Sequence, residues 1–420
     1  MNGRDRLRIA IQTFGTRGDV QPYIALALGL IKAGFEVQLA APLQFAAMVS
    51  EYGVPFVPLP GELLALIDTP AGKSAIVNGQ GFGAGLKLLK HVRPLMRQLL
   101  DAEWTAVEAF APEVIIYHPK SLAAPHMAQR LGCTAILASP LPGFTPTSAF
   151  PSPLLPFANL GPLNRVSHAV AIRGAGLLFG KAMRDWRSTS LGLPRRGAAR
   201  LGPAATLYAY SPHVVPRPAD WGDDVSVGGY WFLDSEAWRP DASLAAFLQA
   251  GEPPVYVGFG SMPGIDPNRM TELVIEGLAQ AGARGLLAIG GGALAATANT
   301  RSVHVITGAP HDKLFHYVGA TIHHGGAGTT AAGLRAGKPT IACPFFGDQP
   351  FWGRRIAQLG VGPSPLNRKA LSPESIASAI KAMRQREMRE RATALGAAIR
   401  GDDGVGSAVA FIDRVMARDA

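Results

Sequence analysis

Apolar and polar positions along the first forty residues follow a strand, turn and helix pattern. Residues 7–13 form a short, largely apolar run, and a turn with two glycines follows it. Apolar residues then recur with helical spacing over residues 22–33, where Pro22 suits a first helical turn and Gly34 a C-terminal cap. The stretch FEVQLAAP resumes a strand pattern. We therefore predict a βαβ unit whose helix begins near Pro22.

The same alternation continues downstream and is repeated in the second half of the chain. In the first half, the strand patterns EVIIYHP and TAILASP flank a helix pattern over residues 122–131. In the second half, a helix pattern over residues 269–281 lies among the strand patterns PPVYVGFGSM, GLLAIGGG, VHVITGAP, ATIHHGG and PTIACPF. A chain of 420 residues exceeds the usual size of one domain. We predict two α/β domains, each with a parallel sheet covered by helices.

A boundary between the domains is predicted where this periodicity is lost. Proline, tryptophan and charged residues cluster over residues 213–240 without regular spacing. We expect a first domain at 1–215, a linker at 216–240 and a second domain at 241–395. The chain is helical from residue 373, and residues 396–420 are expected to cross back to the first domain.

A long segment over residues 140–165 also breaks the pattern. It is dense in proline and in apolar side chains, which excludes a continued helix or central strand. Two interpretations remain open for this loop: a passive connector, or an apolar wall that binds a substrate.

The composition of the chain limits the classes of partner that we expect it to bind. The formal charge of +10 favours contact with anions such as phosphates, nucleic acid or an acidic membrane. Nucleic acid is not expected, because the basic residues are scattered and not interleaved with aromatic ones. The two cysteines, Cys133 and Cys343, lie in apolar strand-like settings and do not indicate a disulfide. Without a signal-like or membrane-spanning run, we expect a cytoplasmic protein with at most peripheral membrane contact.

The most informative motif covers residues 321–353. A strand pattern ends at His324, and a glycine-rich turn leads into a helix, so backbone N–H groups at the helix start are free to bind phosphate oxygens. An imidazole and a hydroxyl would add directed hydrogen bonds. The predicted diphosphate site comprises His324, Gly325, Gly326, Gly328 and either Thr329 or Thr330.

Two further features of this region have competing interpretations. His323 and His324 also fit a strand-end pair or half of a metal site, although neighbouring strand residues point to opposite faces. Asp348 and Gln349 follow the strand pattern PTIACPF, at the carboxyl edge where doubly wound folds bind ligands. We expect this carboxylate and amide to bind sugar hydroxyls; the alternative is an ordinary polar turn before Pro350.

The N-terminal turn carries the candidate catalytic groups. The turn contains Gly15, Gly18 and Asp19. Its two glycines form a GxxG pattern, which leaves the GxGxxG dinucleotide fingerprint incomplete. Asp19 fits either a helix cap or a base that accepts a proton from an acceptor hydroxyl. His118 ends a neighbouring strand pattern and is a candidate partner at the same sheet edge; the alternative is an ordinary polar residue at a strand end.

Two stretches, GTRGDVQPYIALALGL and HHGGAGTTAAGLRAGKPTIACPFFGDQPFWG, closely resemble the family 1 nucleotide-sugar glycosyltransferases, especially sterol glucosyltransferases and bacterial antibiotic glycosyltransferases. The resemblance covers nearly the whole chain. It implies the GT-B architecture: two Rossmann-like domains facing a cleft, with the acceptor on the N-terminal side and the nucleotide-sugar on the C-terminal side.

The resemblance also implies roles for single positions. Asp19 stands where many relatives have a catalytic histidine and this subgroup has aspartate. On the donor side, the resemblance implies diphosphate binding by His324, a phosphate-binding turn at Gly326, Gly328 and Thr329, and sugar binding by Asp348 and Gln349. It also implies that Ser261 lines the nucleotide-sugar pocket and that the backbone of Ala309 reads the base. We also expect Gly18, in the N-terminal turn, to take part in nucleotide-sugar binding.

Two departures affect the expected donor. Gly308 stands where plant relatives have a tryptophan on uracil, and Ala332 where they have a glutamate on ribose. A dTDP-sugar therefore remains an alternative to a UDP-sugar. We expect an inverting transfer to an apolar small-molecule acceptor without a metal or resident cofactor; the alternatives are a nucleotide-sugar epimerase, a non-catalytic apolar-ligand binder and an NAD-dependent oxidoreductase.

Overall fold

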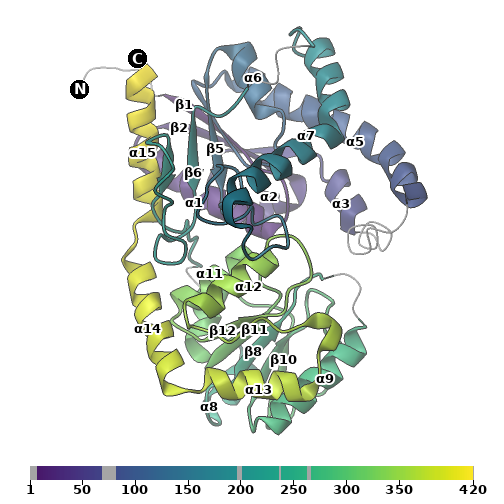
Figure 1. Cartoon of the computed structure of the whole chain (residues 1–420), viewed down its shortest axis with the longest axis vertical. Helices are drawn as coiled ribbons and strands as arrows, with labels where there is room; N and C mark the ends of the chain where they lie inside the picture. The colour runs from purple at the N-terminus through teal and green to yellow at the C-terminus, as the bar shows by residue number, and fades with distance from the viewer. Residues whose placement is uncertain (1–6, 69–81, 196–200, 236–237, 263–265, 420) are drawn as a thin grey trace.

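The computed structural model describes residues 7–68, 82–195, 201–235, 238–262 and 266–419. Two parallel sheets, each covered by helices, are stacked along the long axis of the molecule (Figure 1). The strands are β1 (Arg8–Gln12), β2 (Glu36–Pro42), β3 (Phe56–Leu59), β4 (Val114–Tyr117), β5 (Thr134–Ser139), β6 (Ala205–Tyr208), β7 (Val225–Val227), β8 (Val255–Gly258), β9 (Gly285–Ala288), β10 (Val303–Ile306), β11 (Ala320–His323) and β12 (Thr340–Ala342).

Helices connect these strands and cover both sheets. They are α1 (Arg17–Lys32), α2 (Ala46–Glu51), α3 (Glu62–Asp68), α5 (Phe82–Phe110), α6 (Ala124–Leu131), α7 (Asn164–Thr189), α8 (Ala242–Gln249), α9 (Pro267–Gln280), α10 (His311–Leu314), α11 (Ala327–Arg335), α12 (Gln349–Gln358), α13 (Pro373–Met383), α14 (Arg386–Gly401) and α15 (Gly404–Asp419). Within the described part of the chain, no helix combines the length and apolar character needed to cross a bilayer.

Strand order follows the doubly wound pattern in both domains. Among the described residues, the first sheet has the order β3-β2-β1-β4-β5-β6-β7 and the second the order β10-β9-β8-β11-β12. The order reverses beside β1 in one sheet and beside β8 in the other, which opens a crevice at the carboxyl ends of the strands. The predicted α/β class with two parallel-sheet domains is confirmed.

The first helix begins earlier than predicted. α1 starts at Arg17, so Pro22 lies inside the helix and Gly18 and Asp19 belong to its first turn. The reason is a local contact: the Thr16 N–H donates to Asp19 Oδ2 over 2.7 Å, which starts the helix before the proline. The cost is one backbone hydrogen bond, because Pro22 has no N–H to donate to the helix.

The segment predicted as a linker contributes to the first sheet. β7 lies within residues 216–240 and pairs with β6 in parallel, so the sheet continues beyond residue 215. Residues 236–237 of that segment lie outside the described residues.

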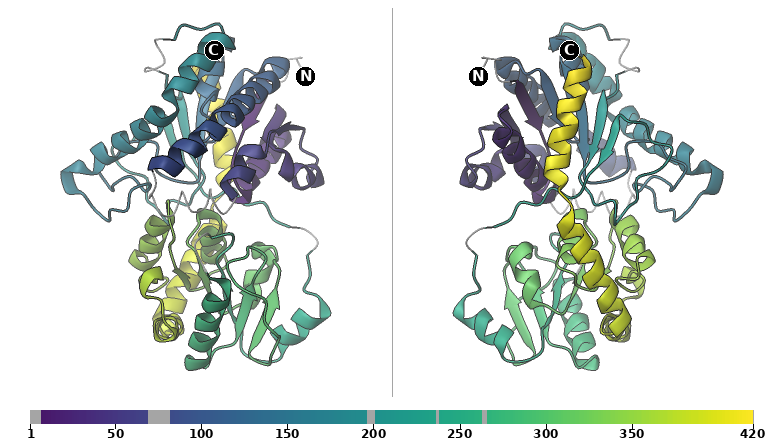
Figure 2. Two further views of the ribbon diagram at one scale, coloured as in Figure 1. Left: turned by 90° about the vertical axis from the view of Figure 1, so that its right-hand side faces the viewer. Right: turned by 90° about the vertical axis from the view of Figure 1, so that its left-hand side faces the viewer.

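The C-terminal helices bridge the two domains. α14 contacts α11 of the second domain and α15 contacts α1 of the first, so the predicted return of the chain begins after Gly401, not at residue 396 inside α14. Figure 2 shows both helices running along one side of the molecule. The chain passes between the domains twice, once after Gly229 and once between α14 and α15, and these two segments contact each other. A Cβ on Gly229, whose φ is 131°, would lie 2.8 Å from Asp402 Cβ and 3.0 Å from Gly404 Cα. Glycine at these crossings allows the close backbone approach.

Separate apolar cores stabilise each sheet and the contact between the domains. The first core packs β1 and β2 against α1 and α15, and the second packs β8 and β11 against α9 and α13. A third cluster joins the domains, where Tyr210 and Trp221 pack in the same group as Trp352 and Ile356. Both cysteines are free; Cys343 is buried and Cys133 is half-buried.

Candidate active site

Asp19 occupies a defined position at the start of α1. It is the third residue of the helix, and its Oδ2 accepts hydrogen bonds from the backbone N–H and the hydroxyl of Thr16 at 2.7 and 3.1 Å. Gly15, with φ of 144°, precedes this turn, and a Cβ there would collide with the Asp19 carboxylate and lie 2.8 Å from Lys120 Nζ. Glycine at this position therefore leaves room for the carboxylate.

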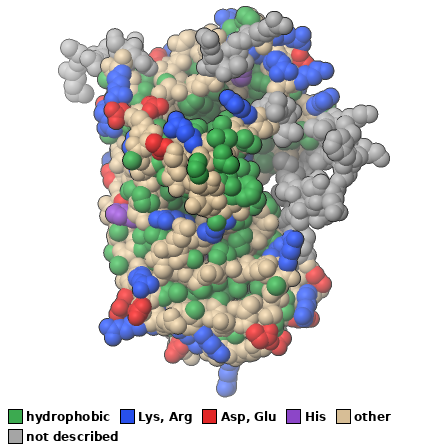
Figure 3. Space-filling view, viewed as in Figure 1, with side chains coloured by type: hydrophobic (Ala, Val, Ile, Leu, Met, Phe, Trp, Pro, Cys, Tyr) green, Lys and Arg blue, Asp and Glu red, His purple; other side chains and the backbone are tan. Residues whose placement is uncertain are grey.

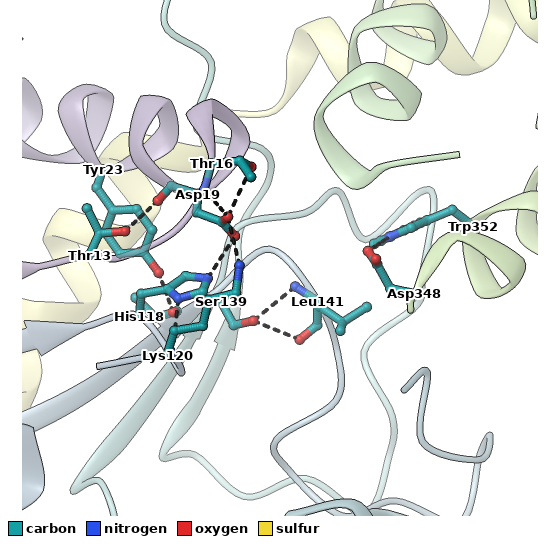
Figure 4. Close-up of polar contacts among 11 residues, drawn as sticks. Thr13, Thr16, Asp19, Tyr23, His118, Lys120, Ser139, Leu141, Asp348 and Trp352 are labelled. Carbon is teal, nitrogen blue, oxygen red and sulfur yellow. Dashed lines mark hydrogen bonds and ion pairs between the residues drawn. The ribbon is translucent and has the colours of Figure 1, made fainter. Parts of the chain in front are cut away.

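The loop after β4 supplies two partners for Asp19 (Figure 4). His118 Nε2 lies 3.2 Å from Asp19 Oδ1, and Lys120 Nζ lies 2.8 Å from Asp19 Oδ2. The Lys120 backbone N–H donates to His118 Nδ1 over 3.2 Å, so Nε2 carries the proton of the neutral ring and donates it to Asp19. The predicted pairing of Asp19 with His118 is present in the structure.

Electrostatics keep Asp19 ionised and His118 neutral. Burial by itself would raise the pKa of Asp19, but the Lys120 ammonium and the hydrogen bond from His118 together hold that pKa well below its usual range. Burial lowers the pKa of His118 despite the opposing effect of Asp19. His118 uses both ring nitrogens in these contacts, so the group with capacity to accept a proton is the Asp19 carboxylate.

A buried polar network supports the loop from behind. The Ser121 hydroxyl donates to Glu103, and the Gln12 amide donates to the Glu103 carbonyl over 3.1 Å. Burial raises the pKa of Glu103 to about 8. Tyr23 packs edge-on against the His118 ring, with ring centroids 5.8 Å apart, and donates its hydroxyl to the Ala138 carbonyl. These contacts restrain the His118 ring and the backbone that follows it.

In the second domain, the turn between β11 and α11 leaves the helix start without a side-chain cap. Gly326 is the N-cap residue, and among the residues that the structure describes no side chain accepts from the first-turn amides. Gly325 has φ of 90°, which favours glycine, and a Cβ there would lie 3.1 Å from the Gln349 carbonyl oxygen. Its N–H donates to His323 Nδ1 over 2.9 Å. Gly325 therefore shapes the turn, while the following amides remain free to bind an anion.

His324 and Thr330 border this helix start. The His324 ring packs beside Gly260, where a Cβ would lie 3.8 Å from it, and against Gly326. Among the described residues, His324 Nδ1 and the Thr330 hydroxyl are buried with no hydrogen-bond partner. Burial lowers the pKa of His324 to about 4, so the ring is neutral near pH 7. An oxygen-rich anion at this turn would satisfy polar groups that the protein itself leaves unpaired.

The half-site interpretation of the two histidines has no support from neighbouring side chains. The His323 and His324 rings lie at 79° to each other, and His323 is fully buried with its Nδ1 bound to the turn. Among the described residues, no three His, Cys, Asp or Glu side chains gather closely enough to hold a metal ion.

Asp348 and Gln349, the residues expected to bind sugar hydroxyls, have different environments. Asp348 Oδ2 accepts from Trp352 Nε1 over 2.8 Å. Gln349 is buried, and its Oε1 accepts from the N–H groups of Phe345 and Phe346 at 2.7 and 3.2 Å. The Gln349 amide thus holds the loop that places Asp348, because its oxygen accepts from two backbone N–H groups of that loop.

Asp348 faces the N-terminal site across the gap between the domains (Figure 4). Burial raises its pKa, and the charge of Asp19 raises it further, while Lys120 and the Trp352 hydrogen bond oppose that rise. The candidate catalytic and sugar-binding carboxylates are therefore close enough to influence each other.

The remaining predicted residues lie at the same edge of the second sheet. Ser261 follows β8 and is exposed, and Ala309 follows β10 and is half-buried. Sequence reasoning missed Lys120 and Trp352. The available signals were a basic residue two positions after His118 and a tryptophan one helical turn after Asp348.

Family models match most of each domain. Residues 9–147 match the glycosyltransferase family 28 N-terminal domain, and residues 286–402 match the erythromycin biosynthesis protein CIII-like C-terminal domain. Among solved structures, the glycotransferase of kitacinnamycin superposes with a TM-score of 0.73 at 20% identity, covering 98% of this chain and all of that one. This likeness supports the GT-B fold.

Curated relatives extend the match over almost the full length. A sterol 3-beta-glucosyltransferase from Arabidopsis thaliana is 36% identical over 96% of this chain and 67% of its own length. A sterol 3-beta-glucosyltransferase from Aspergillus fumigatus is 35% identical over 98% of this chain but only 30% of its own length. The chain has two glycine turns, two parallel sheets and about one third sequence identity to these relatives over almost its full length. It therefore belongs to the family 1 glycosyltransferases, in the group that includes the sterol 3-beta-glucosyltransferases.

Proposed function

We propose that this protein is an inverting glucosyltransferase that moves glucose from UDP-glucose to a hydroxyl of an apolar acceptor such as a sterol or triterpenoid. One arrangement carries the proposal: an ionised carboxylate, Asp19, lies across the domain gap from Asp348. Asp348 follows β12, and the neighbouring strand β11 leads into a helix start that has no side-chain cap among the described residues. A proton acceptor and an anion site on opposite walls are what a single displacement at a sugar carbon requires.

In the proposed reaction, the acceptor hydroxyl donates its proton to Asp19 as its oxygen bonds to C1 of the sugar. The bond between C1 and the diphosphate oxygen breaks on the opposite side, which inverts the configuration at C1. Charge that develops on the diphosphate is stabilised by the first-turn amides of α11 and by the His324 imidazole. His118 positions Asp19, and Asp348 binds sugar hydroxyls.

We propose that Lys120 controls the charge of Asp19. Its ammonium contacts the same Oδ2 that Thr16 contacts, and its side chain is half-exposed, so it has space to move when an acceptor hydroxyl approaches. The lysine keeps Asp19 ionised before the acceptor arrives. Because a strongly stabilised carboxylate is a weak base, movement of Lys120 away from Oδ2 would raise its basicity for the transfer step.

A dTDP-sugar is the second candidate donor. A glycosyltransferase of the same fold, VinC, with a TM-score of 0.66 and 16% identity, has been solved in complex with dTDP. In this chain, Gly308 and Ala332 replace the bulkier residues expected to contact uracil and ribose. These small residues supply neither the stacked ring nor the carboxylate that would select uracil and ribose.

The test is a matrix of donors and acceptors. UDP- and dTDP-sugars are paired with sterols, triterpenoids and polyphenols, and products are identified by mass spectrometry, with the anomeric configuration read by NMR. We expect a β-glucoside from UDP-glucose, formed equally well in excess EDTA. Retained α-configuration, or sugar-nucleotide consumption that needs no acceptor, would contradict the proposal, and the latter would indicate an epimerase.

A further inference from the structure

Exposed apolar side chains are concentrated on one face of the first domain. Of the nine large hydrophobic residues that are exposed among the described residues, six lie between residues 154 and 172. We call them the α7 patch: Leu154, Phe157, Leu163, Val166, Val170 and Ile172. Figure 3 shows hydrophobic side chains gathered on the face of the molecule where α7 lies in Figure 1. Single exposed apolar residues need no explanation, but a contiguous cluster marks an interaction site.

The first turns of α7 have the opposite polarity to that of an ordinary surface helix. Leu163, Val166 and Val170 are spaced to share one helical face and are 52–59% exposed. The opposite face turns Asn164, Ser167 and His168 into the protein, where they are at most 5% exposed. In water, a helix that buries polar side chains and exposes apolar ones is unfavourable. The exposed apolar face therefore indicates a partner that is less polar than water.

The buried polar residues fix the patch in shape. The Asn164 amide donates to the Ser148 carbonyl over 3.0 Å and accepts from the Leu160 N–H over 2.9 Å. Ser167 accepts from the Ser152 N–H over 2.8 Å. These contacts tie the loop over residues 148–160 to α7. The loop therefore presents Leu154 and Phe157 beside the helix as a preformed surface.

Charge around the patch is positive. The sequence has no Asp or Glu between Glu113 and Asp185. In the same stretch, α7 carries four exposed basic residues: Arg165, Arg173, Lys181 and Arg184. One acidic group from elsewhere faces them, since Asp220 Oδ2 lies 3.6 Å from Arg165 Nη1 and also accepts from the Ser148 N–H. An apolar face bordered by cations is complementary to an anionic bilayer surface.

The loop also connects the patch with the candidate active site. It begins after Ser139, at the carboxyl end of β5, where the Leu141 N–H donates to the Ser139 hydroxyl beside the Asp19 site (Figure 4). We propose that the α7 patch docks on the surface of an anionic lipid bilayer, so that an apolar acceptor reaches the site from the membrane. Docking itself is independent of the proposed glucosyl transfer, whereas delivery of the acceptor rests on it.

The test is sedimentation of the full chain with vesicles of phosphatidylcholine, alone or mixed with phosphatidylserine. We expect binding to the mixed vesicles that weakens as salt rises. The double substitution Val166→Ser with Val170→Ser should lower the partition coefficient by about 10-fold or more, because the apolar contact is lost. Tyr317→Ser, at an exposed position of the second domain, is the matched control and should leave binding unchanged.

Charge is tested separately. Arg173→Gln and Lys181→Gln should each lower the partition coefficient about fivefold, which corresponds to about 1 kcal/mol per basic residue near the surface. Arg269→Gln, on α9 of the second domain, is the control and should have no effect. A salt-independent interaction, or equal binding to both kinds of vesicle, would overturn the assignment to an anionic surface.

The docking proposal is overturned if the unmodified chain does not bind vesicles, or if the variant with both Val166→Ser and Val170→Ser binds them as well as the unmodified chain does. It is also overturned if light scattering shows a dimer that this variant abolishes and the chain does not bind vesicles. A higher KM for a water-soluble acceptor in that variant, without any effect on vesicles, would assign the patch to the acceptor wall instead. Transfer to soluble acceptors without lipid is measured in parallel, so failure of the transferase proposal is seen independently of vesicle binding.

Discussion

Two turns of this protein have the same local architecture and different chemistry. In each, a parallel strand ends in a glycine-bearing turn that leads into a helix: β1 into α1, and β11 into α11. At α1, the third helical residue is Asp19, and its carboxylate already accepts from the Thr16 amide. At α11, the third helical residue is Thr329, and the helix start has no side-chain cap.

We propose that this difference lets one supersecondary unit serve two purposes. A fixed negative charge at the start of α1 occupies the position that favours anions and would repel a phosphate. The same location in α11 carries no acid and is bordered by unpaired polar atoms of His324 and Thr330. We infer that the chain separates proton acceptance from phosphate binding by the choice of one residue in each turn.

The largest effect is expected from Asp19→Asn. Asparagine keeps the size of the side chain and an oxygen for the Thr16 amide, but it lacks the charge that accepts a proton. Turnover should fall by about 10²- to 10⁴-fold, the usual contribution of a general base. Affinity for UDP, measured by calorimetry, should stay unchanged because the α11 turn is intact.

Thermal unfolding serves as the control for Asp19→Asn, since a large loss of stability would confound the rate. Turnover near that of the unmodified protein would remove Asp19 from the reaction and leave it as a helix cap alone.

An intermediate effect is expected when the acid of the first turn is copied into the second. Thr329→Asp places a carboxylate at the third residue of α11, where it should stabilise the helix by about 0.3–1 kcal/mol. Affinity for UDP should nevertheless fall about 10-fold or more, because a charge-assisted contact is replaced by repulsion between anions. The measurements are calorimetric titration with UDP and denaturant unfolding.

Thr329→Asn is the matched control, with similar size and no charge. If both variants bind UDP equally, the diphosphate does not lie at the α11 turn, and the comparison between the two turns loses its basis.

The smallest effect is expected from Lys120→Gln, which removes a cation that helps to hold the pKa of Asp19 below its usual range. That pKa should rise, so the acidic limb of the kcat/KM profile should move to higher pH. The free energy of unfolding should also decrease in this variant. The lowered pKa of Asp19 stabilises the folded state above its unfolded pKa, and this contribution is lost as pH falls. Without Lys120 the contribution becomes smaller, by less than about 1 kcal/mol for a half-exposed pair.

The control for this prediction is Lys32→Gln, at an exposed position in the last turn of α1. A pH profile that shifts equally in both variants would indicate a general effect of net charge, and one that does not shift at all would separate Lys120 from Asp19 during the reaction.

Local sequence signals predicted the position of both turns and most of the strands, but not β3, β6 or β7. Apolar runs bounded by glycine or proline mark β1, β4, β8 and β11, because buried parallel strands need continuous apolar residues. The expected meeting of Asp19 and His118 followed from the same logic, since His118 comes directly after β4 and Asp19 lies in the turn and helix start that follow β1, the neighbouring strand. The start of α1 was misplaced because a proline signal outweighed the contact between Asp19 and Thr16, which depends on side-chain geometry.

Sequence by itself determined the alternation of strands and helices, the two glycine turns, and which of them carries an acid, because these depend on residues a few positions apart. Only the tertiary structure decided which distant groups meet. Lys120 reaches Asp19 from another strand, Gln349 is taken up by backbone amides of its loop, and the polar face of α7 turns inward toward residues 148–152. These outcomes depend on packing between segments far apart in the chain, where burial, charge and hydrogen bonding are settled together.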